Sequence, residues 1–177
     1  MLRAVRIIAA ALLVTCVPAT ATAKWTRLRT EHFVFVGDAS ESDIRRVAQK
    51  LDEFREVLTR ALGGGATKSP VPTVVIVFRS DSSFTPYKPH FQGHPIELAG
   101  VFQDGDDASY IAINAEAIDV ALRTIFHEYT HFLVGNTAGI VPVWVNEGLA
   151  EVYATFTTGF DTADLREARA LLGSSPA

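Results

Sequence analysis

Apolar and polar residues recur with two different periods along the chain, and the change of period marks where helices and strands are expected. Residues 42–62 place their apolar side chains at the three- and four-residue spacing of one helical stripe, with charged residues on the opposite face. The same period returns over residues 117–134, 143–156 and 163–172. A break from Gly135 to Pro142 is expected to separate the first two of these later helices.

Stretches rich in β-branched and aromatic residues predict the strands. They cover residues 31–36, 72–78, 100–102 and 110–113, and an aspartate-rich turn joins the last two. Residues 79–95 contain several prolines and are expected to form a loop that includes His90 and His94, with a place for these two histidines along the cleft as the alternative. A strand, a helix, further strands and then helices follow one another along the chain. This order is typical of an α+β protein.

The N-terminus is a different kind of sequence. Arginines precede an apolar run over residues 7–17, and small residues follow at Ala21 and Ala23. This is the order of a secretory signal, and the apolar run is too short to cross a bilayer comfortably. We therefore expect residues 1–23 to be a signal peptide, with a buried N-terminal helix as the alternative. Residues 24–177 are then expected to form one domain.

Composition and charge narrow the possible partners. With 48% hydrophobic and 20% charged residues, the chain can bury a substantial core. Its net charge of −4 gives no reason to expect nucleic acid or an anionic membrane surface as a partner. The only cysteine, Cys16, lies in the expected signal, so the mature domain needs no disulfide framework. We expect an exported protein, periplasmic or secreted, and a lipoprotein anchored through Cys16 is the alternative.

The candidate chemistry lies in the segment HEYTH, which begins at His127 and ends at His131. Two histidines at positions i and i+4 of a helix project from one face, close enough for both rings to bind one ion. Zn²⁺ binds neutral imidazole readily and leaves room for a water molecule. Glu128 can face that water without binding the metal, and can take its proton. The apolar residues just before the motif place it on a core helix.

The next helix offers a third ligand. It presents Glu147 and, one turn further on, Glu151. If this helix returns antiparallel, Glu147 faces the two histidines, and Gly148 lets the two helices approach each other. Glu151 is then placed to accept a hydrogen bond from the far nitrogen of His127 or His131. The alternative is a pair of solvated glutamates.

Taken together, HEYTH and PVWVNEGLAEVY resemble the gluzincin clan of zinc peptidases, and most closely the peptidase MA-like domains of bacterial exported proteins. The resemblance implies a zincin-like fold, in which a small mixed sheet with a backing helix precedes the metal-binding helix and the glutamate helix. It implies that His127, His131 and Glu147 bind Zn²⁺. It also implies that Glu128 is the general base and that Glu151 supports a ligand histidine.

The same resemblance implies the reaction and its partner. Peptide bonds of a peptide or protein substrate are expected to be hydrolysed by metal-activated water. In such enzymes an edge strand beside the metal binds the substrate backbone, and the candidates here are Gly100, Val101 and Phe102, or residues 110–114.

Two departures from the clan pattern keep alternatives open. The gap before Glu147 is shorter than in the best-known gluzincins. The chain also has neither tyrosine nor histidine after Tyr153, where those enzymes usually carry a group that stabilises the oxyanion. Losing one such donor typically lowers the rate by about 10²- to 10³-fold. Tyr110 or Tyr129 could replace the missing oxyanion donor. A zinc-stabilised binding or scaffold domain is therefore the main alternative. A module without metal, in which the motif is coincidental, is the third.

Overall fold

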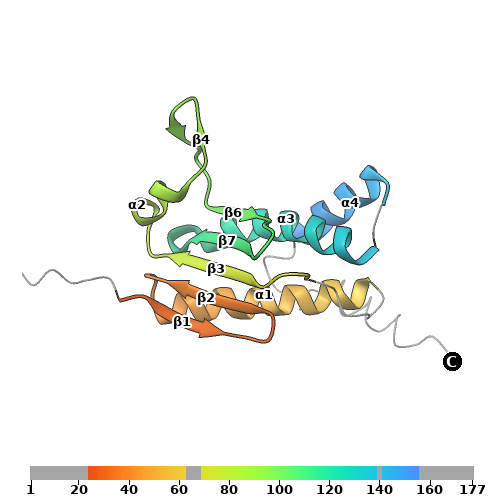
Figure 1. Cartoon of the computed structure of the whole chain (residues 1–177), viewed down its shortest axis with the longest axis horizontal. Coiled ribbons are helices and arrows are strands. Elements are labelled where there is room, and N and C mark those ends of the chain that lie inside the picture. The colour runs from red at the N-terminus through yellow and green to blue at the C-terminus, as the bar shows by residue number, and fades with distance from the viewer. Residues whose placement is uncertain (1–23, 63–68, 139–140, 156–177) are drawn as a thin grey trace, which may run out of the picture.

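A five-stranded mixed sheet forms the framework of the protein (Figure 1). The structure, a computed structural model, describes residues 24–62, 69–138 and 141–155. The strand order is β1-β2-β3-β7-β6, with β2, β3 and β7 parallel and each edge strand antiparallel to its neighbour. These strands are β1 (Thr26–Arg29), β2 (Phe33–Gly37), β3 (Thr73–Phe78), β6 (Gly100–Gln103) and β7 (Ser109–Asn114). Together with four α-helices in the described residues, they confirm the α+β class.

One face of the sheet carries the core. Because successive strand residues point to opposite faces, every second residue of the central strands is buried against the helices, Phe35, Val75 and Ile111 among them. Helices α1 (Glu41–Ala61) and α3 (Ile118–Ala138) contribute to this same core. α3 is therefore fixed along the side that faces the sheet.

Most predicted elements are present. The four predicted strands appear as β2, β3, β6 and β7, and three of the predicted helices appear as α1, α3 and α4 (Val143–Ala154). The expected signal, residues 1–23, and the expected last helix, residues 163–172, lie outside the described residues. No helix within the described ranges is long and apolar enough to cross a membrane.

Two expectations about element boundaries are wrong or incomplete. The sequence does not predict β1. Of its residues only Leu28 packs against the core, so the strand has no alternating apolar pattern, and it forms by pairing with β2. The expected break at Gly135 is also wrong, since α3 continues to Ala138. Gly135 lies on the exposed side of the helix, where a glycine costs about 1 kcal/mol relative to alanine. Burial of the neighbouring Leu133 and Val134 outweighs that cost.

The expected loop at residues 79–95 contains short ordered elements instead. They are α2 (Asp81–Phe84), η1 (Thr85–Tyr87) and the small hairpin of β4 (His90–Phe91) and β5 (His94–Pro95). The prolines prevent a long helix but not these single turns. His90 pairs with Pro95 and His94 with Phe91, so the two histidines lie on opposite faces of the hairpin, and both are exposed. They form no second metal pair.

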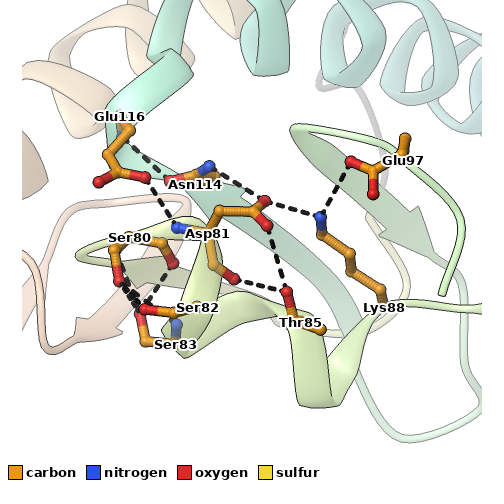
Figure 2. A network of polar contacts seen from close by, with 9 residues as sticks. All are labelled: Ser80, Asp81, Ser82, Ser83, Thr85, Lys88, Glu97, Asn114 and Glu116. Carbon is orange, nitrogen blue, oxygen red and sulfur yellow. Dashed lines mark hydrogen bonds and ion pairs between the residues drawn. The ribbon is translucent and has the colours of Figure 1, made fainter.

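A buried lysine ties this segment to the end of the sheet (Figure 2). The side chain of Lys88 is only 1% exposed, and its ammonium group lies 2.6 Å from Asp81 and 3.8 Å from Glu97. Asp81 also accepts from the side-chain amide of Asn114, at the end of β7, and its own backbone amide donates to Glu116. A buried charge is retained only where it is paired, so these contacts hold α2 against β7.

This network predicts a pH-dependent part of the stability. The hydrogen bond from Lys88 lowers the pKa of Asp81 below its ordinary value. A carboxyl whose pKa is depressed by folding contributes stability above its unfolded pKa, about 3.9, and loses it as the pH falls through the folded value. We expect the urea midpoint of the wild type to fall more between pH 5 and pH 3 than that of Asp81→Asn. Equal pH dependence of the two midpoints would contradict this role of Asp81, and Glu56→Gln, which alters an exposed ion pair, serves as the control.

Candidate metal centre

The buried side of α3 sets the direction of its two histidines. Phe126 stacks on Phe54 of α1 with ring centroids 4.1 Å apart, and the buried Tyr129 accepts a hydrogen bond from Arg55 of α1. Burial raises the pKa of Tyr129, which keeps its phenol neutral. Because an α-helix turns by about 100° per residue, Tyr129 lies opposite His127 and His131. Anchoring of this inner side therefore points both histidines away from the core.

Helix α4 packs on α3 and also contacts α1 through one aromatic residue. Ala150 and Ala154 are buried, and Tyr153 packs edge-on against Phe54 with centroids 6.3 Å apart. Short alanine side chains allow two helix axes to lie close together. The expected role of Gly148 is wrong, since a side chain there would meet nothing within 4 Å. Gly148 is exposed, and the alanines on the other side of α4 make the close approach possible.

The two helices bring His127, His131 and Glu147 together. The Nε2 atoms of His127 and His131 lie 3.2 Å apart. Oε2 of Glu147 lies 3.8 Å from Nε2 of His127 and 3.6 Å from Nε2 of His131. The histidines are about one quarter exposed and Glu147 is 58% exposed. The prediction that an antiparallel α4 brings Glu147 to the histidine pair is confirmed.

These three atoms form a group that could hold a metal ion. Four tetrahedral ligands bound to zinc at about 2.0–2.2 Å lie about 3.3–3.6 Å from one another, which is close to the three distances observed. Two imidazole nitrogens and one carboxylate oxygen also have the composition of a catalytic zinc site with an open position. The donor set fits a divalent ion.

The far ring nitrogens of the two histidines differ. Nδ1 of His127 lies 3.8 Å from Glu151, whereas Nδ1 of His131 is buried with no hydrogen-bond partner in the described part of the chain. Of the two histidines named for Glu151 on sequence grounds, the structure brings it to His127. Sequence reasoning missed Arg123, whose guanidinium lies 3.6 Å from Glu151. Its spacing of four residues before His127 is the signal that could have identified it.

Glu128 and β6 lie to one side of the histidines. Glu128 is exposed and, at about 100° per residue, projects from the flank of α3 between the histidine side and the side that contacts β6. Phe102 of β6 packs against Tyr129, and a side chain at Gly100 would come within 3.1 Å of Ala121. β6 therefore runs closely along α3.

Only one of the two candidate substrate strands is an edge. β6 is one of the two edge strands of the sheet, with Gly100 and Phe102 turned toward α3 and Val101 toward the opposite face. β7 lies between β3 and β6, so the alternative at residues 110–114 is wrong as an edge. Its backbone donors and acceptors are already used in two ladders.

Neither tyrosine named as an oxyanion donor faces the group. Tyr129 is fully buried on the inner side of α3. Tyr110 pairs with Gln103 and follows the buried Ser109, and its neighbour Ile111 points into the helix-covered core. Tyr110 therefore points to the other face of the sheet. The expectation that Tyr110 or Tyr129 serves as the oxyanion donor is therefore wrong. The reason is the direction of each side chain, which residue type alone does not reveal.

Comparison with known proteins adds no family assignment, since no family model and no curated protein matches this chain. The group of His127, His131 and Glu147 is the feature of this chain that points to a chemistry.

Proposed function

We propose that this protein is a zinc-dependent peptidase of the gluzincin kind with a zincin-like fold. The observation that carries the proposal is the convergence of His127 Nε2, His131 Nε2 and a Glu147 oxygen from two antiparallel helices. The order of elements supports it, because a mixed sheet backed by α1 precedes the histidine helix and the glutamate helix. Zinc is the proposed ion because this donor set suits it.

Each residue has a distinct task. His127, His131 and Glu147 hold the ion, which, when bound, acts as a Lewis acid and lowers the pKa of water in the open position. Glu128 accepts the proton of the attacking water and passes it to the leaving amine. Its position beside His127, exposed and outside the ligand group, leaves the carboxylate available for this transfer.

The substrate is proposed to lie along β6. This strand forms the edge of the sheet next to α3, on the flank from which Glu128 projects. An extended peptide that pairs with the backbone of Gly100, Val101 and Phe102 would pass in front of that carboxylate. Main-chain pairing of this kind accepts many side chains, so the strand gives orientation more than sequence preference.

A second candidate function is a zinc-stabilised binding or scaffold domain without catalysis. It is favoured by the positions of Tyr110 and Tyr129, which leave the group without a tyrosine oxyanion donor from either residue. Tyr153, on α4, packs against Phe54 in the core. The loss of such a donor lowers the rate by about 10²- to 10³-fold but leaves metal binding intact.

Digestion of a peptide library separates the two functions. The zinc-loaded protein, residues 24–177, is incubated with the library before and after treatment with a chelator, and the products are identified by mass spectrometry. A peptidase gives new termini that disappear with the chelator and return when zinc is restored. Zinc binding without any cleavage would support the scaffold function, and cleavage that is insensitive to the chelator would contradict the proposed mechanism.

A further inference from the structure

We propose that Arg123 is a positioning residue for the metal centre, which holds the carboxylate of Glu151 against Nδ1 of His127. This inference rests on the proposed zinc site, because its purpose is to prepare one of the ligands. Arg123 is not one of the three residues proposed to bind the ion. It reaches the centre only through Glu151, which lies close to both Arg123 and His127.

The three groups follow one line along the two helices. Arg123, His127 and His131 are spaced four residues apart on α3, so their side chains stand one above the other on the same side. Glu147 and Glu151 are spaced likewise on the antiparallel α4. Because the helices run in opposite directions, Glu147 comes to the histidine pair while Glu151 comes level with Arg123 and His127.

Glu151 uses its two oxygens for two different partners. Oε1 lies 3.6 Å from Nη2 of Arg123, and Oε2 lies 3.8 Å from Nδ1 of His127. The side chain is 66% exposed, so without Arg123 it would have little to restrict its rotamers. The ion pair turns the carboxylate toward α3, where the second oxygen meets the imidazole.

A carboxylate at Nδ1 determines which ring nitrogen is free to bind metal. The Glu151 carboxylate, 3.8 Å from Nδ1 of His127, favours the neutral ring form that carries its proton on Nδ1, and this leaves the lone pair on Nε2, the atom that faces His131 and Glu147. Outer partners of this kind typically change metal affinity by about 10- to 100-fold.

Arg123 also has an effect that weakens zinc binding, so the direction in which zinc affinity changes when Arg123 is removed tests the proposal. Its positive charge repels a nearby cation, although exposure and salt weaken that repulsion. If Arg123 acts through Glu151, its removal weakens zinc binding while Glu151 is present. Once Glu151 has been replaced, only the repulsion remains, and removal of Arg123 no longer weakens binding.

The experiment is a double-mutant cycle on zinc affinity, measured by competition with a chromophoric chelator. It compares the wild type, Arg123→Gln, Arg123→Lys, Glu151→Gln and the double variant Arg123→Gln/Glu151→Gln. We expect Arg123→Gln to weaken zinc binding by about 3- to 10-fold and Glu151→Gln by about 10- to 100-fold. Arg123→Lys should recover part of the loss because it keeps the charge. In the Glu151→Gln background, Arg123→Gln should leave the affinity equal or slightly higher.

Two outcomes would overturn the inference while leaving the zinc site intact. One is unchanged or tighter zinc binding by Arg123→Gln alone, and the other is the same loss whether or not Glu151 is present. Failure of the proposed zinc site would look different, because the wild type itself would then bind no zinc, and failure of the proposed peptidase activity alone would leave these zinc affinities as predicted. Arg46→Gln is the matched control, since it breaks an exposed ion pair to Asp119 in the first turn of α3 and should leave zinc affinity unchanged.

Discussion

Replacement of Glu128 by glutamine is expected to lower kcat/KM for peptide cleavage by about 10²- to 10⁴-fold, the usual contribution of a general base. Glutamine has almost the same shape but cannot accept the proton of the attacking water. The zinc content should remain that of the wild type, because Glu128 lies outside the ligand group of His127, His131 and Glu147. Both quantities can be measured on one preparation, by steady-state kinetics and by elemental analysis.

The control for this variant is Glu56→Gln, which removes an exposed carboxylate from α1 and should leave cleavage unchanged. A Glu128→Gln protein that cleaves at the wild-type rate would show that another group takes the proton. A variant that has lost its zinc would show that Glu128 supports the metal rather than the water.

Replacement of His131 by alanine is expected to weaken zinc binding by more than about 100-fold, since a ligand contributes more than an outer partner does. The variant keeps His127 and Glu147 but has only two of the three donors. Its melting temperature without metal should stay near that of the wild type, whereas the rise on addition of zinc should disappear. Differential scanning calorimetry with and without zinc measures both.

His94→Ala is the matched control, because His94 is an exposed histidine of the β4–β5 hairpin. It should keep the full rise in melting temperature. If His131→Ala responds to zinc as strongly as the wild type does, the ion is held elsewhere and the assigned ligands are wrong.

The sequence was sufficient where local pattern and core burial agree. The apolar stripe of residues 42–62 predicts α1 because the same side chains that set its period enter the core. β1 could not be predicted in this way, since its formation depends on pairing with β2 and on Leu28 alone for burial. The end of α3 at Ala138 does not follow from the local sequence either, because burial of Leu133 and Val134 overrides the local preference of Gly135.

In the candidate site, too, some features follow from local sequence and others depend on packing between helices. Helical spacing predicts that His127 and His131 share a side, and the antiparallel return predicts that Glu147 meets them. Contacts between helices decide the rest, which spacing does not reveal. The alanines of α4 rather than Gly148 allow the close approach, and the inner side of α3 removes Tyr129 from any role at the metal. The spacing of Arg123 places it on the same side of α3 as His127, but its pairing with Glu151 depends on how α4 packs against α3.

The central claim is that one zinc ion lies between side chains of α3 and α4. Crystals of the zinc-loaded protein, with diffraction recorded on both sides of the zinc absorption edge, test it most directly. We predict a single anomalous peak per chain, within about 2.0–2.2 Å of Nε2 of His127, Nε2 of His131 and an oxygen of Glu147. No peak at that position, or a peak bound by other residues, would contradict the account.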